Sequence, residues 1–345
     1  MMNQRDLVSS KDELILQDAR YGRRKLAYAG TGLLLLVVAL AGILYGAIPL
    51  TLHELLLLIQ GQGTSDTERI VYYLRLPRVI CAALVGMNLA LAGCILQGVL
   101  HNLLADPGII GVTAGAGVAA MAVMILAPAF IYWVPLAAFV GALVALAIVF
   151  LLAWNRGINP LRLILAGVAV AAFFGGGTTA LWVAFPDRIQ GAVNWLAGGF
   201  AGARWSYVWI ALPYSVIGLL GTLWNYRKLN ALQMGDEVAL SLGINLKRTR
   251  FILIFLAAIL AASSASVAGL LGFVGLIVPH IMRLIVGSDF EYLLPASAVF
   301  GAALLVGADT FARTAFSPME IPVGIFLSFL GAPFFLYLLK RRSRG

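Results

Sequence analysis

Long apolar stretches recur along almost the whole chain, and they constrain its fold more than any other feature of the sequence. About 20 consecutive apolar residues are needed for a helix to cross the hydrocarbon core of a bilayer. Charged residues make up 11% of this chain, whereas a soluble domain carries about 25%. The sequence therefore predicts an all-α, polytopic membrane protein. Nine stretches meet or approach the required length: 26–50, 79–100, 109–127, 130–154, 161–185, 206–224, 250–268, 293–311 and 321–339.

A tenth apolar stretch, 270–286, is interrupted by Gly272, Gly275 and Pro279. Irregular backbone survives at membrane depth only where it is buried in protein or lines a cavity. We therefore count this stretch as a tenth span and regard its three interrupting residues as candidates for a pathway or a gate. The first apolar stretch is longer than the roughly 7–15 residues of a signal peptide, so we expect it to stay in the membrane as an anchoring helix.

Basic residues at both ends of the chain predict its topology. Four Lys and Arg residues lie within 20–25, and four more lie within 340–345. The positive-inside rule places both clusters in the cytoplasm, which requires an even number of spans and so favours ten over nine. We expect a multi-pass protein of the cytoplasmic membrane. Its predicted parts are a cytoplasmic tail over 1–25, a single transmembrane domain over 26–339 and a basic cytoplasmic tail over 340–345.

The most polar internal segment, 230–248, lies on the predicted cytoplasmic side and has the pattern of a short helix. Two acidic residues stand in its first turn, where the helix dipole favours negative charge, apolar residues share one side, and a glycine is placed to end it. Asn245 can then cap the next span. A solvated connector is the ordinary interpretation, but the apolar side of so small a helix needs a partner. The residues predicted to contact another protein are Asp236, Glu237, Ala239, Leu242 and Gly243.

Patterns typical of enzymes and metal sites are missing from the sequence. It has no phosphate-binding G-x-x-x-x-G-K-[ST] loop, so ATP hydrolysis of that kind would need another subunit. The three histidines are far apart, and both cysteines lie in one apolar stretch, which indicates neither a metal-ligand set nor a disulfide framework. We expect no catalytic residue, no metal, no cofactor and no nucleic-acid partner.

Ionisable residues are scarce within the spans, which argues against an ion-coupled transporter working alone. Asp309 and Arg283 come nearest to mid-membrane, and both lie towards the ends of their predicted helices. Because Asp309 precedes Arg313 by four residues, an ion pair within one helix is one explanation for the presence of Asp309 and Arg313.

Three arginines, Arg75, Arg78 and Arg313, lie at the predicted outer ends of spans. Arginines at helix ends commonly reach towards lipid headgroups, which is the plain alternative for this set. Positive charge on the outer side runs against the positive-inside trend, however, and guanidinium forks are suited to carboxylates. We therefore interpret these arginines as a docking site for a negatively charged partner.

A glycine cluster, Gly175, Gly176 and Gly177, lies within the fifth span. Such clusters usually allow helices to pack closely. In a transporter the same small residues can also line a pathway or allow a helix to move. The sequence leaves both interpretations open.

Several motifs in order make the chain similar to the permeases of bacterial ABC importers for iron–siderophores, haem and cobalamin. Each motif alone is weak, but together they are specific and cover nearly the whole chain. They are Arg75-Leu-Pro-Arg78, Leu104-Ala-Asp-Pro-Gly108, Asn194-Trp-Leu196, Gly235-Asp-Glu-Val-Ala-Leu-Ser-Leu-Gly243, Gly272-Phe-Val-Gly-Leu276, Pro279-His-Ile-Met-Arg283, Ala308-Asp-Thr-Phe-Ala-Arg313, Glu320-Ile-Pro-Val-Gly324 and Gly331-Ala-Pro-Phe334.

The resemblance implies ten helices arranged as in cobalamin-importer permeases, in a homodimer or close heterodimer with the pathway on the dimer axis. Two cytoplasmic ABC ATPase subunits would hold the segment 236–243. An extracytoplasmic substrate-binding protein would dock through acidic residues that meet Arg75, Arg78 and Arg313.

The expected function is ATP-driven import of an iron–siderophore type of metal chelate, with ATP hydrolysed by a separate subunit. A pathway for bare metal ions would be expected to present His, Cys or carboxylate ligands. The spans 161–185, 270–286 and 321–339 offer small and apolar residues, with His280 as their one plausible ligand. Haem or a corrinoid is the alternative cargo within the same family. A secondary transporter that works alone is a more distant alternative.

Overall fold

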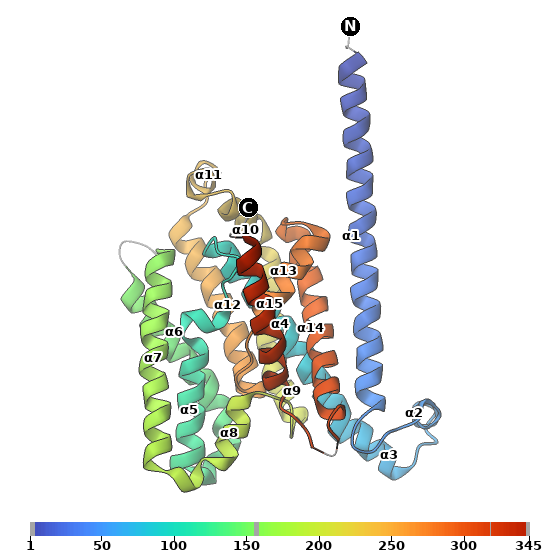
Figure 1. The fold of residues 1–345 in the computed structure, drawn as a ribbon, viewed down its shortest axis with the longest axis vertical. Coiled ribbons are helices and arrows are strands. Elements are labelled where there is room, and N and C mark those ends of the chain that lie inside the picture. Colours follow the sequence, from blue (N-terminus) through green and yellow to red (C-terminus); the bar gives the residue numbers. More distant parts are fainter. Residues whose placement is uncertain (1–3, 155–158, 318, 343–345) are drawn as a thin grey trace.

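The computed structural model describes residues 4–154, 159–317 and 319–342, and every regular element in these ranges is a helix (Figure 1). Seven of these helices are long and apolar enough to cross a membrane, and three shorter apolar helices accompany them. Together they coincide with the ten expected spans, including the interrupted one. The predicted all-α, polytopic membrane fold is confirmed.

The helices fall into three groups: those long and apolar enough to cross a membrane, three with a shorter apolar part (Val323–Leu336 in α15), and the remaining short ones. The long ones are α1 (Gln4–Leu44), α4 (Leu76–Val99), α6 (Val134–Ala153), α7 (Pro160–Ala184), α9 (Trp205–Trp224), α12 (Leu246–Ala268) and α14 (Phe290–Thr314). The other apolar ones are α5 (Val112–Leu126), α13 (Val274–Val286) and α15 (Val323–Arg342). The short ones are α2 (Leu52–Ile59), α3 (Ser65–Arg69), α8 (Gln190–Ala197), α10 (Tyr226–Gln233) and α11 (Asp236–Ser241).

The short helices mark the two ends of the bundle (Figure 1). Helices α10 and α11 lie at the end from which the N-terminal part of α1 projects, and we call it the α11 end. Helices α2, α3 and α8 lie at the opposite end, which we call the α3 end. The two candidate sites predicted from the sequence therefore lie at opposite ends.

Helices α4 and α12 form the centre of the bundle. In the most apolar part of each helix, 78% of the residues are buried. In the apolar part of α1, which lies at the edge of the bundle, the share is 11%. Helix α4 packs against α12, α14, α13 and α9. A Cβ atom at Gly86 would lie 2.2 Å from the Gly301 carbonyl oxygen, and one at Gly93 would lie 1.9 Å from that of Gly275. Helix α4 therefore meets α14 and α13 at backbone contact, as small residues allow in membranes.

Buried polar side chains also join α4 to its neighbours. Asn88 Nδ2 donates to Ser215 Oγ on α9 at 2.8 Å. Gln97 accepts from Arg283 Nη1 on α13 at 3.0 Å and donates to the Gly275 carbonyl at 3.2 Å. Polar groups that are buried in a bundle need such partners.

The interruption expected within 270–286 is smaller than the sequence suggested. The backbone is irregular only before α13, where Phe273 has φ of 68°, and α13 itself continues through Pro279. Proline has no N–H to donate to the carbonyl four residues earlier, which is that of Gly275. Gln97 supplies the missing donor, so the helix tolerates the proline without breaking.

Helix extends into both predicted tails. Residues 4–25, which we expected to be a tail before the first span, continue α1 as helix. This stretch contains no proline and is rich in good helix formers such as Leu, Glu, Lys and Arg, which favours helix over an extended tail. At the other end α15 reaches Arg342, and residues 343–345 lie outside the described residues.

Candidate functional site

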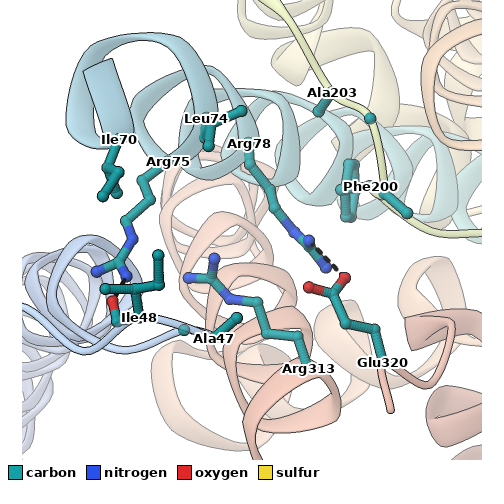
Figure 2. A pocket seen from close by; sticks show the side chains of 13 residues that line it. Ala47, Ile48, Ile70, Leu74, Arg75, Arg78, Phe200, Ala203, Arg313 and Glu320 are labelled. Atoms are coloured by element: carbon teal, nitrogen blue, oxygen red, sulfur yellow. Dashed lines mark hydrogen bonds and ion pairs between the residues drawn. The ribbon is translucent and has the colours of Figure 1, made fainter. Parts of the chain in front are cut away.

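Three arginines converge on one cavity of about 270 Å³ at the α3 end (Figure 2). Arg75 ends a π-helical turn that leads into α4, Arg78 lies in the first turn of α4, and Arg313 lies in the last turn of α14. The structure thus brings together the three residues predicted to dock a partner.

Arg78 is neutralised within the chain by two carboxylates. Its Nε and Nη2 atoms donate to the two oxygens of Asp309 at 2.8 and 3.0 Å, and Nη1 donates to Glu320 Oε2 at 2.8 Å. The Asp309 side chain is 5% exposed and that of Glu320 is 42% exposed. The alternative explanation, an ion pair between Asp309 and Arg313, is therefore wrong, because the Asp309 carboxylate pairs with Arg78. Across the α4–α14 interface, Arg78 presents a planar fork that binds both oxygens of the carboxylate at once.

Arg75 and Arg313 are buried and turned into the chain (Figure 2). Arg313 donates to the carbonyl of Gly42, and Arg75 donates to those of Leu44 and Ile48. The last carbonyls of a helix lack partners within it, and cations are favoured at that end. These two arginines therefore cap the end of α1 and its connection to α2. Neither guanidinium extends along the bundle surface as headgroup contact would require.

A second cavity of about 620 Å³ adjoins the first and shares Arg78, Phe200 and Glu320 with it. Arg204 lines it, with its guanidinium 5.3 Å from the ring centre of Tyr132 and 5.0 Å from that of Tyr207. The α3 end is thus hollowed, with cations in and beside the hollow.

The predicted short helix at the opposite end exists as α11. It begins after Gly235 and ends before Gly243, whose φ values are 110° and 77°. Asn245 then caps α12 by accepting from the Arg248 N–H at 3.1 Å. The expected helix, its glycine end and the cap of the next span are all present.

The side chains of α11 divide differently from our expectation. Ala239 is fully buried, whereas Leu240 and Leu242 are 57% and 62% exposed. Ala239 and Leu242 therefore do not share a side, because Leu242 lies beyond the last helical residue, at the C-cap. Asp236 pairs with Arg250 at 2.7 Å and ties α11 to α12. A partner at this segment would meet the exposed leucines and not Ala239.

The candidates for a pathway or gate are not brought together. Gly175 and Gly176 lie on α7 with open space where a side chain would be, and Gly272 also faces open space. Gly275 and Pro279 are buried inside the bundle. Gly177 is closest to another helix, with a Cβ position 3.2 Å from Val118 of α5.

Asp106, from the motif Leu104-Ala-Asp-Pro-Gly108, lies close to Gly275 of α13. It lies in the connection between α4 and α5, where its Oδ1 accepts from the Gly108 N–H at 2.9 Å. Its Oδ2 would lie 3.2 Å from a Cβ atom at Gly275 of α13. Burial raises the pKa of the carboxyl to about 6, while the Gly108 hydrogen bond lowers it.

Two residues that matter to these sites were missed at the sequence level. Glu320 is the exposed counter-ion of Arg78, and Gln97 completes α13 at Pro279. A glutamine in an apolar span signals a buried hydrogen bond, so Gln97 could have been found. Glu320 could not be paired with a residue 242 positions earlier from spacing alone.

Within the described residues, no group of three or more His, Cys, Asp and Glu side chains is placed to hold a metal ion. The His280 ring packs edge-on against Phe334 with centroids 5.9 Å apart.

Residues 34–341 match the FecCD transport family. The chain is 40% identical to the iron(3+)-hydroxamate import system permease protein FhuG of Bacillus subtilis, over 91% of this chain and 96% of that protein. It is 38% identical to the hemin transport system permease protein HmuU of Yersinia pestis, over 90% and 94%. With the cobalamin import system permease protein BtuC of Halobacterium salinarum, identity is 44% over 81% and 76%.

A solved structure has the same fold. It is described as a metal-chelate type ABC transporter in an inward-facing conformation. The TM-score is 0.83 with 29% sequence identity, and the match covers 92% of this chain and 99% of the other.

Proposed function

Because this chain belongs to the FecCD transport family, we propose that it is the membrane permease through which an ABC importer carries a ferric siderophore or similar iron chelate. The observation that carries the cargo is the 40% identity, along nearly the whole length of both chains, to a permease named for iron(3+)-hydroxamate import. A relative named for Fe(3+)-citrate is equally similar. Haem or a corrinoid is the second candidate, since other relatives are named for hemin and cobalamin.

The chemistry of the spans supports a wrapped metal over a bare ion. A divalent or trivalent ion that crosses alone needs ligand atoms along its route. The described spans hold no cluster of such ligands. A chelated metal keeps its own ligands, so the pathway needs only enough width and a lining compatible with the surface of the chelate.

The α11 end is proposed to face the cytoplasm and to carry the ATPase. Positive-inside charge supports this orientation, because basic residues gather near the two ends of the chain, and α1 projects at the α11 end (Figure 1). Leu240 and Leu242 are exposed apolar side chains on a segment outside the spans, which is typical of a contact surface. The acidic Asp236 and Glu237, with Gly243 ending the segment, would fix its shape.

The α3 end is proposed to receive the substrate-binding protein. Arg78 is the most accessible of the three clustered arginines, and Glu320 beside it is 42% exposed. Arg75 and Arg313 would not contact the binding protein directly. They would hold α1 and α14 in place and add positive potential to the hollow.

A second permease subunit is proposed to lie against α7. The most apolar part of α7 is only 22% buried, and Gly175 and Gly176 leave its surface open to close approach. The pathway would then run between the two copies, with Gly272 near it. The single transmembrane domain is proposed to extend over 26–339.

The test is reconstitution of the full chain with its own ATPase and binding protein in liposomes, followed by uptake of labelled ferric siderophore, haem, cobalamin and bare Fe(III). We expect ATP-dependent uptake of the intact ferric siderophore and none of the bare ion. Uptake without ATP, or uptake of the bare ion, would contradict the proposal. Uptake of haem or cobalamin alone would change the cargo and leave the importer in place.

A further inference from the structure

A groove of about 400 Å³ runs along the outside of the bundle near the α11 end. It lies between the second half of α6 and the first half of α12, which pack against each other. Its walls are apolar side chains from these two helices: Leu143, Leu146, Ala147, Phe150, Leu151, Trp154, Phe251 and Phe255.

Aromatic rings give this groove a fixed shape. Phe150 contacts Phe251 with ring centroids 5.2 Å apart, and Phe251 stacks on Phe255 at 6.2 Å. Leu146 is buried at 3% exposure, whereas Leu151 and Trp154 at the rim are 79% and 52% exposed. The groove is therefore a preformed slot on the outside of the bundle, between two helices long and apolar enough to cross a membrane.

Two basic residues, Lys247 and Arg248, lie one helical turn nearer the start of α12 than the slot. Lys247 lies four residues before Phe251 and eight before Phe255, so it shares their face of α12 one turn nearer the helix start. Helical side chains lean towards the N-terminus, which directs Lys247 away from the slot and towards the headgroup level. Arg248 follows it, and both are exposed. In the described part of the chain, neither side chain has a hydrogen-bond or ion-pair partner.

Trp154 completes the arrangement at the end of α6. It is the C-cap residue of α6 and lines the slot at the same end as the cations. Tryptophan is enriched where acyl chains meet headgroups, because its ring is apolar and its N–H is polar. Slot, tryptophan and cations thus follow one another in the order of an acyl chain, a glycerol region and a phosphate.

We propose that this groove is a binding site for an anionic phospholipid, with one acyl chain in the slot and the phosphate beside Lys247 and Arg248. Charge complementarity selects this occupant over a neutral lipid, since basic residues at the membrane surface attract anionic headgroups. The apolar, aromatic slot selects a chain over a soluble anion.

The test is native mass spectrometry of the full-length permease, titrated with phosphatidylglycerol or with phosphatidylcholine of the same acyl chains. Wild-type protein is expected to retain phosphatidylglycerol at lower lipid concentration. Lys247→Gln should weaken this retention about fivefold. The control Arg227→Gln removes an exposed cation on α10 at the same end of the bundle and should leave it unchanged.

A second pair of variants tests the slot itself. Ala147→Trp places a large side chain in the groove, whereas Val144→Trp places it on an exposed position of α6 outside the groove. Ala147→Trp should abolish the preference for phosphatidylglycerol, and Val144→Trp should not. Equal retention of the two lipids by wild-type protein would overturn the proposal, as would an unaffected Ala147→Trp. Loss of a bound protein chain in Ala147→Trp would instead identify the groove as a protein contact and would also overturn it.

Discussion

At the α3 end charged side chains are turned into the chain, whereas at the α11 end apolar side chains are turned out of it. Asp309 is 5% exposed beneath Arg78, while Leu242 is 62% exposed on the C-terminal side of α11. The first arrangement ties α4 to α14 and leaves Arg78 and Glu320 as the members of the cluster that a partner can reach. The second adds little to the bundle and leaves surface free for contact. Charge and exposure together, and not sequence polarity alone, distinguish the residues that hold the bundle together from those that a partner can contact.

The largest expected effect is at the buried pair. Asp309→Ala leaves the Arg78 guanidinium without its main partner, and breaking a buried pair costs about 3–5 kcal/mol. Thermal unfolding of the detergent-solubilised protein should show a clearly lower midpoint. An unchanged midpoint would mean that the α3 cluster does not stabilise the bundle, and the contrast between the ends would fail.

The next effect is at the exposed leucine. Leu242→Asp should leave the unfolding midpoint unchanged, because the side chain is 62% exposed. It should weaken retention of the ATPase by about 2–4 kcal/mol if Leu242 is a central contact. Co-purification and ATPase titration measure this. Wild-type retention by the variant would show that the coupling contact lies elsewhere.

A smaller effect is expected at the end of α11. Gly243 has φ of 77° with open space around it, so Gly243→Ala adds strain of about 1–2 kcal/mol without a clash. Hydrogen exchange over 236–243 should accelerate while the core amides stay protected. Gly30→Ala is the matched control, since Gly30 lies within α1, has no positive φ and also faces open space. Faster exchange at the core amides would show that α11 is not an independent segment.

The smallest effect on stability is expected at Glu320. Its pair with Arg78 is partly exposed, so Glu320→Gln should cost no more than about 1 kcal/mol. The same change leaves Arg78 less neutralised, and it should speed association of an acidic binding protein and steepen its salt dependence. Stopped-flow association at two ionic strengths measures this. A slower association would mean that Glu320, and not Arg78, meets the partner.

The spans and α11 could be predicted because their signals are local. Hydrophobic length gives a span, and acidic residues followed by a glycine give a short capped helix. The partner of Arg78 could not be predicted, because Asp309 lies 231 residues away and a nearer partner for Asp309, Arg313, was available on the same helix. Side-chain directions on α11 were likewise set by packing, which buries Ala239 and leaves Leu242 outside.

Pro279 is a second case in which a distant partner could not be found from the sequence. Its effect on a helix is known in advance, but whether the helix breaks depends on whether a donor is available for the Gly275 carbonyl. Gln97 supplies that donor from α4, 178 residues earlier. The local pattern therefore identified Pro279 as a possible break in the helix, but it could not identify Gln97 as the donor that replaces the missing hydrogen bond.

The distant partners of α4 have a consequence for how the protein is made. Asn88 and Gln97 enter the membrane with α4, but Ser215 and Gly275 are synthesised 127 and 178 residues later. Polar groups without partners in a lipid environment cost several kcal/mol. The buried hydrogen bonds of α4 can therefore be completed only after α9 and α13 have been synthesised. A nascent chain that stops before α13 lacks both partners of Gln97, the Gly275 carbonyl and Arg283.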